Sequence, residues 1–196
     1  MENDKRAELE LPEIVLASGS PRRSEILDSV GWTFVKIVPD IDESEIDGET
    51  PGEYVTRLAV TKAEAIAKRC PGKVVLGADT TVVIDGAIIG KPVDSDDARR
   101  MITGLSGRSH EVLTGVALSR DGHTLSGIRS TNVLFSKLNS AEIEYLVEYG
   151  SPLDKAGAYA VQAQAALFIE QIEGDYWNVV GLPISLVYRL FNQLSA

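Results

Sequence analysis

Two adjacent arginines, Arg22 and Arg23, stand where the sequence predicts the start of a helix. They follow the small residues Ser18-Gly19-Ser20, and a short apolar run before that turn predicts a buried strand. Free N–H groups at a helix start attract anions, whereas the helix dipole disfavours cations there. A polyanion held by the turn and by both guanidinium groups would explain the arginines, and a basic helix start facing solvent is the alternative. No Gly-Lys-Ser/Thr closes the turn, which argues against a P-loop.

One carboxylate and two lysines are candidates to work beside this anion site. Asp79 interrupts a strand-like apolar run, so we expect it to be paired, bound to a metal or placed at the mouth of a cleft. Lys62 shares a helix face with Leu58 and Ile66, either as a lysine at the edge of the core or as one that reaches a buried phosphate. Lys91 follows a predicted hairpin and could extend over the same cleft.

A strongly acidic segment over residues 39–47 adds further carboxylates. Such a segment is usually a solvated, mobile connection, although one of its carboxylates could bind a magnesium ion. Cations, a metal ion and a carboxylate are together the groups that bind a triphosphate and hydrolyse it. The positive charges stabilise developing negative charge, and the carboxylate orients or deprotonates the attacking water.

The composition argues against several other classes of protein. The 196-residue chain has a formal net charge of −10 at pH 7, whereas nucleic-acid binding requires a basic face. The single cysteine, Cys70, excludes a disulfide framework, and two histidines argue against a His-rich zinc site. No signal peptide, lipidation motif or run of about eighteen apolar residues is present, so we expect a cytoplasmic protein that does not associate with membranes.

Strands and helices alternate early in the chain and hairpins dominate later, which predicts an α/β fold with a mixed sheet flanked by helices. We expect residues 12–196 to form one domain, with two lobes around a central cleft, after a flexible segment over residues 1–11. The expected strands cover residues 14–16, 33–38, 74–85, 110–118, 124–135 and 166–172. The expected helices are capped by Ser20, Thr50, Ser95 and Ser140, and a last helix follows Gly181-Leu182-Pro183. A final hairpin is expected at Gly174-Asp175.

Several blocks of the sequence resemble, in order, the Maf family of nucleoside triphosphate pyrophosphatases over nearly the whole chain. These blocks are LASGSPRRSEIL, the Asp42-Glu43 pair, Leu58 through Lys62-Ala63, GADTTVV, Gly90-Lys91-Pro92, SGRSHEVLTGVAL, DKAGAYAVQ and VVGLPI. The resemblance implies an elongated α/β fold similar to that of the inosine triphosphate pyrophosphatases, with the substrate between two lobes. It implies hydrolysis of a nucleoside triphosphate to the monophosphate and pyrophosphate with a divalent metal, Mg²⁺, Mn²⁺ or Co²⁺, and a homodimer is a further expectation.

The resemblance also implies roles for individual residues. Asp79 would accept a proton from the attacking water and contribute to metal binding, and Glu43 would bind the metal or the water. The residues expected to contact phosphate are Ser18, Ser20, Arg23, Lys62 and Lys91.

Three further residues bear on the base that the protein would prefer. Arg22, Thr80 and Gln162 match the group of the family that prefers dTTP and UTP, and a glutamine amide suits a pyrimidine edge because it both donates and accepts. Ala163 stands where the family usually has glycine, so the base pocket is expected to differ there. The alternatives are a 7-methyl-GTP pyrophosphatase and a nucleotide-binding regulator of cell division or septum formation without turnover.

Overall fold

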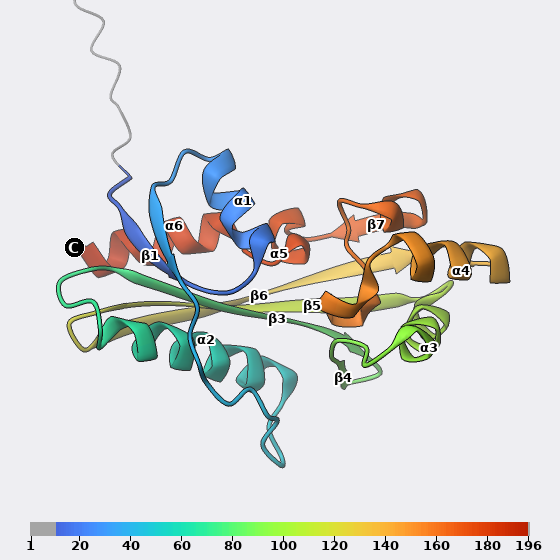
Figure 1. Cartoon of the computed structure of the whole chain (residues 1–196), viewed down its shortest axis with the longest axis horizontal. Helices are drawn as coiled ribbons and strands as arrows, with labels where there is room; N and C mark the ends of the chain where they lie inside the picture. The colour runs from blue at the N-terminus through green and yellow to red at the C-terminus, as the bar shows by residue number, and fades with distance from the viewer. Residues whose placement is uncertain (1–10, 196) are drawn as a thin grey trace, which may run out of the picture.

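A seven-stranded mixed sheet forms the centre of the computed structural model, which describes residues 11–195 (Figure 1). Its strands are β1 (Ile14–Ala17), β2 (Phe34–Ile37), β3 (Val75–Ile84), β4 (Ala87–Ile89), β5 (Ser109–Arg120), β6 (His123–Phe135) and β7 (Ile169–Glu173). They lie in the order β2-β1-β3-β5-β6-β7, with β4 paired to β3 outside this path. Strand β1 is parallel to β2 and β3, and the other pairs are antiparallel. The predicted mixed α/β fold is confirmed.

Helices cover both faces of this sheet. They are α1 (Pro21–Ser29), α2 (Pro51–Ala67), α3 (Ser95–Leu105), α4 (Ser140–Tyr149), α5 (Tyr176–Val180) and α6 (Ile184–Ser195), with short 3₁₀ turns η1 (Pro152–Asp154), η2 (Ala156–Ala158) and η3 (Gln164–Leu167). Within residues 11–195, no helix has the length and apolar character needed to cross a bilayer. The flexible segment expected over residues 1–11 lies outside the described residues except for Leu11, which packs partly buried against the core.

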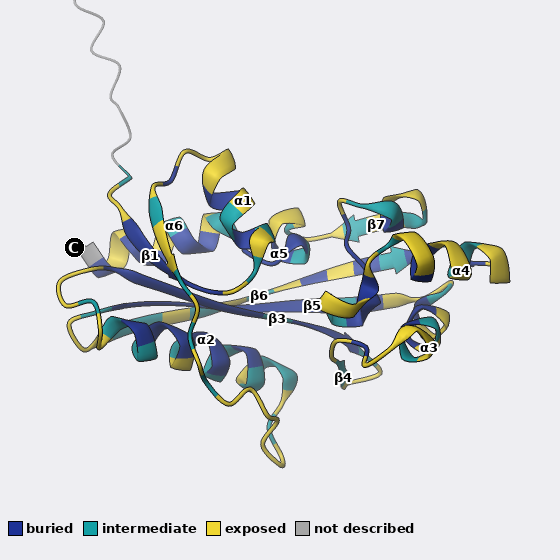
Figure 2. Cartoon of the chain, viewed as in Figure 1, coloured by how far each residue is buried: buried dark blue, intermediate teal, exposed yellow. Residues whose placement is uncertain are grey.

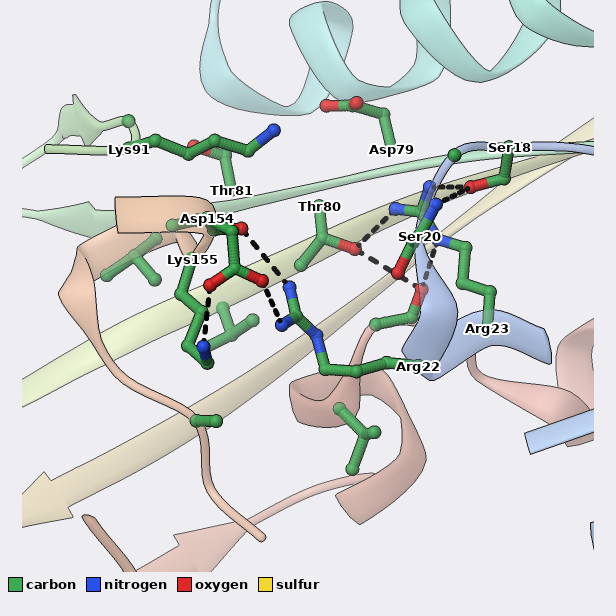
Figure 3. A pocket seen from close by; sticks show the side chains of 18 of the residues that line it. Ser18, Ser20, Arg22, Arg23, Asp79, Thr80, Thr81, Lys91, Asp154 and Lys155 are labelled. Carbon is green, nitrogen blue, oxygen red and sulfur yellow. Dashed lines mark hydrogen bonds and ion pairs between the residues drawn. The ribbon is translucent and has the colours of Figure 1, made fainter. Parts of the chain in front are cut away.

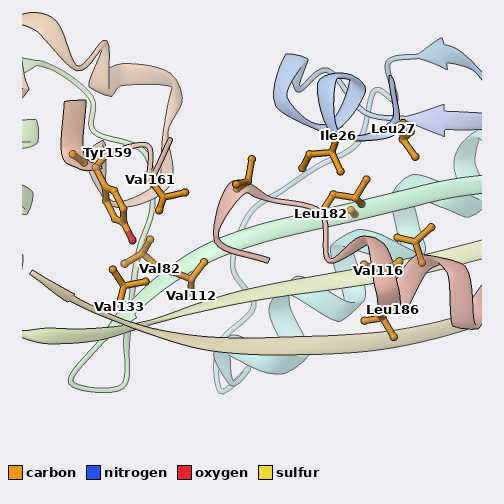
Figure 4. Packing of buried hydrophobic residues seen from close by; sticks show 14 of the residues in the cluster. Ile26, Leu27, Val82, Val112, Val116, Val133, Tyr159, Val161, Leu182 and Leu186 are labelled. Carbon is orange, nitrogen blue, oxygen red and sulfur yellow. The ribbon is translucent and has the colours of Figure 1, made fainter. Parts of the chain in front are cut away.

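The main hydrophobic core lies between the sheet and helices α1, α3, α4, α5 and α6. Figure 4 shows Tyr159 and Val161 beside Val82 at one end of this core, and Ile26 near Leu182 at the other. Among the described helices, only α2 packs on the opposite face, where its sheet side is buried and its outer side is mostly half-buried (Figure 2). The molecule is elongated along β3, β5 and β6 (Figure 1), and successive residues of β1 and β3 point to alternate faces, as the period of a strand requires.

Two predicted helix caps are wrong by one residue. Helix α3 is capped by Asp94, whose side chain accepts a hydrogen bond from the Asp97 N–H, and Ser95 is its first residue. Helix α4 is capped by Asn139 in a capping box with Glu142, and Ser140 is its first residue. Asp and Asn cap at least as well as Ser, so a pair of adjacent polar residues leaves the choice of cap to the local geometry. The capping box predicted at Thr50 is confirmed.

The chain after residue 163 also differs from the prediction. The expected strand over residues 166–172 is replaced by η3 and the shorter β7. The expected hairpin at Gly174-Asp175 is instead a helix start, because the Asp175 carboxylate accepts hydrogen bonds from the N–H groups of Trp177 and Asn178. An apolar run does not by itself distinguish a strand from a buried turn.

Two glycines allow the backbone of α2 to approach the sheet closely. A Cβ atom on Gly77 of β3 would lie 2.2 Å from the carbonyl oxygen of Ala59, and one on Gly115 of β5 would lie 2.3 Å from that of Val55. Both distances are far shorter than a carbon–oxygen contact, so only glycine fits. The depth at which α2 sits therefore depends on these two positions, as does the placement of the α2 side chains that face the sheet.

Gly115→Ala is expected to lower the free energy of unfolding by about 3 kcal/mol, because the added methyl group must push the α2 backbone off the sheet. Urea denaturation would measure the change. Gly104→Ala is the matched control, since a Cβ atom added to Gly104 of α3 would meet no neighbouring element within 4 Å, and we expect it to be neutral or stabilising by less than about 1 kcal/mol. Equal stabilities for the two variants would show that α2 does not need this close approach.

Candidate active site

A cavity of about 560 Å³ opens between the start of α1, strand β3 and the segment that carries η1 and η2 (Figure 3). Its volume is within the range of sites that bind small molecules. All the predicted site residues line it: Ser18, Ser20, Arg22, Arg23, Glu43, Lys62, Asp79, Thr80, Lys91 and Gln162. The fold therefore brings together groups that the sequence left far apart.

The turn between β1 and α1 forms one wall of the cavity. The Ser18 hydroxyl accepts hydrogen bonds from the Ser20 N–H, at 3.1 Å, and from Arg23 Nη1, at 3.0 Å. Ser20 occupies the N-cap position of α1 as predicted, but its side chain makes no capping bond and the first turn contains no acidic residue. The positive end of α1 thus faces the cavity, and no carboxylate within its own first turn neutralises it.

Arg23 is a buried cation whose direct partners are neutral. Its Nε donates to the Gly181 carbonyl at 2.9 Å, and its Nη2 donates to the Thr80 hydroxyl at 3.2 Å. The Thr80 hydroxyl in turn lies 3.0 Å from the Thr114 hydroxyl, so Thr80 lines the cavity and also holds the Arg23 guanidinium. Burial lowers the pKa of Arg23, and the nearby Asp79 carboxylate opposes this shift.

Lys62 joins two carboxylates that line the cavity. Its Nζ lies 2.7 Å from Asp79 Oδ1 and 2.8 Å from Glu43 Oε1. The Lys62 and Asp79 side chains are only 7% and 11% exposed, whereas Glu43 is 49% exposed. Asp79 is thus paired and also at the mouth of a cleft. Burial raises the pKa of the Asp79 carboxyl, and the Lys62 ammonium is the strongest influence acting to lower it.

A second group of charges spans the cavity. Arg22 Nη1 lies 3.2 Å from Asp154 Oδ2, across the cavity from α1 to η1 (Figure 3). Lys155 pairs with the same carboxylate at 2.6 Å. The contact with Arg22 was not predicted, because nothing in the local sequence connects residues so far apart.

Lys91 and Gln162 line the cavity as exposed side chains. Figure 3 shows the Lys91 ammonium directed along the cavity toward Asp79. Neither side chain forms a hydrogen bond or ion pair with another residue in the range 11–195, so both are free to contact a ligand.

Sequence reasoning missed several residues of the cavity wall, including Tyr54 and Thr81. Tyr54 lines it and donates a hydrogen bond to the Glu43 carbonyl at 3.1 Å. The spacing could have predicted this, because Tyr54 lies eight residues before Lys62 on α2. Residues four apart share a helix face, and eight residues are two such steps. Thr81 lies two residues after Asp79 on β3 and lines the same cavity, as strand alternation would predict.

His110 lies in the core and is not part of the cavity lining. It is 3% exposed, and its Nε2 is 2.7 Å from the hydroxyl of Tyr159. Burial lowers the pKa of His110 to about 4, so the ring is neutral at physiological pH. The pair connects β5 to the segment after η2.

The cavity of this mixed α/β fold contains a buried carboxylate among several cations, and it lies beside a helix start that has no side-chain cap. These features define a protein that binds a polyanionic ligand. The chain belongs to the Maf family, since the family model described as Maf-like protein matches residues 13–194.

Curated relatives extend over nearly the whole chain. The dTTP/UTP pyrophosphatase of Symbiobacterium thermophilum is 49% identical over 185 residues, covering 94% of this chain and 95% of the relative. The dTTP/UTP pyrophosphatase of Citrifermentans bemidjiense is 51% identical over 186 residues, covering 93% and 96%. Among solved structures, the Staphylococcus aureus Ham1 protein has a TM-score of 0.48 at 18% identity, covering 80% of this chain and 91% of that one. The family assignment does not depend on this last, partial likeness.

Proposed function

We propose that this protein is a nucleoside triphosphate pyrophosphatase that hydrolyses dTTP and UTP to the monophosphate and pyrophosphate. The observation that carries the proposal is the buried Asp79 carboxylate, which is held by Lys62 at the mouth of a nucleotide-sized cavity lined by cations. Relatives about half identical over almost their whole length carry the name dTTP/UTP pyrophosphatase. A homodimer stays a prediction from the resemblance, and a cytoplasmic location stays a prediction from the sequence.

In the proposed reaction, a water molecule attacks the α-phosphorus through its oxygen, and Asp79 accepts a proton from this water. The bond between this phosphorus and the oxygen that bridges to the β-phosphate breaks, and pyrophosphate leaves with that oxygen. A carboxylate with a raised pKa is a stronger proton acceptor than an ordinary aspartate. Burial supplies this increase, and the hydrogen bond from Lys62 fixes the direction of the carboxylate.

The cations around the cavity would neutralise the phosphate chain. Arg23 and Lys62 are held in place by the fold, so they require little reorganisation as charge develops in the transition state. Lys91 is exposed and unpaired among the described residues, and it could follow the pyrophosphate as it leaves. Ser18, Ser20 and the start of α1 would supply hydroxyl and N–H donors.

A divalent cation fits this site when the substrate completes its ligands. Asp79 and Glu43 direct one oxygen each at the Lys62 ammonium, so both could direct an oxygen at a metal ion. No cluster of three or more His, Cys, Asp or Glu side chains suited to a metal occurs among the described residues, and magnesium is usually held by one or two carboxylates together with substrate phosphates. When bound, such an ion would neutralise phosphate charge and polarise the phosphorus–oxygen bonds.

A panel of canonical and modified nucleoside triphosphates, with Mg²⁺, Mn²⁺ or Co²⁺, tests the proposed function. We expect equal amounts of pyrophosphate and monophosphate from dTTP and UTP. Orthophosphate release would place the cleavage at the terminal phosphate and contradict the proposal, and a preference for 7-methyl-GTP would contradict the proposed base. Binding without turnover would favour the regulator of cell division.

We expect Gln162→Ala to reduce the preference for dTTP and UTP over other nucleotides by about 3- to 10-fold, the effect of one lost hydrogen bond. Gln162 is exposed in the cavity wall, where its amide could pair with a pyrimidine edge. Competition between nucleotide pairs would measure the ratio of kcat/KM values. Gln171→Ala is the control, because Gln171 is exposed on β7 outside the cavity lining. An unchanged substrate ranking in the Gln162 variant would exclude this role.

A further inference from the structure

The segment over residues 39–50 is held to α2 although it contains no helix or strand. It connects β2 to α2 and carries Glu43, the carboxylate that meets Lys62. Six of the ten residues from 40 to 49 are acidic, so their mutual repulsion favours an extended, solvated segment. Apart from Pro39, Ile41 and Glu49, all its residues are exposed. Apolar burial therefore contributes little to its position.

Arg57 of α2 makes the strongest contacts with this segment. Its Nε and Nη2 donate to the two carboxylate oxygens of Glu49 at 2.6 and 2.7 Å, and Nη2 also donates to the Ser44 carbonyl at 3.0 Å. The pair is well shielded, since the side chains of Arg57 and Glu49 are 27% and 10% exposed. A two-pronged arginine–carboxylate contact fixes direction as well as distance, so one guanidinium holds both ends of the stretch from Ser44 to Glu49.

Tyr54 adds a second attachment next to Glu43. Its hydroxyl donates to the Glu43 carbonyl at 3.1 Å, and its ring centroid lies 5.6 Å from the guanidinium carbon of Arg57. Residues 54 and 57 are three apart on α2 and therefore lie on neighbouring turns of the same face. The helix that presents Lys62 thus also holds the segment that presents Glu43.

We propose that Arg57 is a positioning residue, which places the Glu43 carboxylate at Lys62 and Asp79 by holding the segment over residues 39–50 against α2. This inference rests on the proposed function, in which Glu43 acts on the metal or the water. Asp79 comes from the centre of a sheet and needs no such support. Glu43 comes from an exposed connection, and without Arg57 the repulsion among its acidic neighbours would move it away from the cavity.

The experiment compares Arg57→Ala with Arg99→Ala in the full-length chain. Arg99 makes the same two-pronged contact with a single glutamate, Glu144, on the surface formed by α3 and α4, and it does not line the cavity. Amide hydrogen exchange of residues 39–50, kcat, KM and thermal stability would be measured for both variants. Each substitution would also be made in the Glu43→Ala background. A further variant, Glu49→Gln, would weaken the contact between Arg57 and Glu49 by changing the glutamate instead of the arginine.

We expect Arg57→Ala to lower kcat by about 10- to 100-fold, the effect of misplacing one group of a site, with faster exchange over residues 39–50. Glu49→Gln should change both quantities in the same direction by a smaller factor, and Arg99→Ala should change neither. In the Glu43→Ala background, Arg57→Ala should lower kcat by less than about twofold, because the group that it positions is already absent.

Three results would overturn the inference: unchanged exchange in Arg57→Ala, normal kcat despite faster exchange, or a full further loss in the Glu43→Ala background. The last would mean that Arg57 acts on stability or on another group. A wild-type chain that releases no pyrophosphate contradicts the proposed function, whereas an active wild type with an equally active Arg57→Ala variant contradicts this inference alone.

Discussion

Asp79→Asn is expected to lower kcat by about 10²- to 10⁴-fold, the contribution of a positioned general base, while nucleotide affinity changes little. Asparagine has nearly the same shape, but its amide cannot accept the proton of the attacking water. The fold should persist because Lys62 still pairs with Glu43 at 2.8 Å. Single-turnover rates and calorimetric titration of the nucleotide would separate the chemical step from binding.

Asp85→Asn is the matched control for this substitution. Asp85 follows β3, the strand that carries Asp79, but it lies on the surface and pairs with Arg108 at 2.7 Å. Its φ of 52° suits asparagine as well as aspartate. We expect wild-type turnover from this variant, and a folded Asp79→Asn protein with wild-type kcat would exclude Asp79 as the proton acceptor.

Lys62→Met should lower both activity and stability. The substitution leaves Asp79, with its side chain 11% exposed, without the ammonium that lies 2.7 Å from it, and breaking such a buried pair typically costs about 3–5 kcal/mol. We expect kcat/KM to fall by about 10²- to 10³-fold, because a fixed charge next to the phosphate chain is lost. Urea denaturation and steady-state kinetics would measure the two effects.

The pH dependence of this variant gives a sharper test. Burial raises the pKa of Asp79, and Lys62 partly offsets this increase, so its removal should raise the pKa further. Only the carboxylate accepts a proton, and activity is therefore lost as the pH falls through this pKa. The acid limb of kcat/KM should move to higher pH in Lys62→Met. For the same reason, the loss of stability should be fully present above the folded-state pKa of Asp79 in the variant and should shrink as the pH falls through that pKa.

Lys73→Met is the control for these measurements, since Lys73 forms an exposed pair with Glu13 at 3.0 Å. Exposed pairs of this kind contribute about 0–1 kcal/mol, and the acid limb should stay where it is in the wild type. An acid limb that does not move in Lys62→Met, or that moves to lower pH, would contradict the proposed coupling between Lys62 and Asp79.

Most local elements of the first half of this protein can be predicted from adjacent residues in the sequence. The turn before α1, the capping box at Thr50 and the hairpin at Asp85-Gly86 are encoded by adjacent residues, because caps and turns are satisfied within a few positions. The sequence also identified the candidate site residues, first as single groups with unusual neighbours and then through the family blocks. Prediction was weakest after residue 163, where small and apolar residues allow both strands and 3₁₀ turns.

The contacts among these groups depend on how distant elements pack together. Arg22 contacts Asp154 and Arg23 contacts Thr80 because the sheet order brings α1, β3 and η1 to one cavity. The acidic segment, which its composition predicts to be a solvated, mobile connection, is instead held to α2 by Arg57. A single sequence shows the chemical type of each residue, but it does not show which distant residues come into contact. These contacts form only when distant elements pack together.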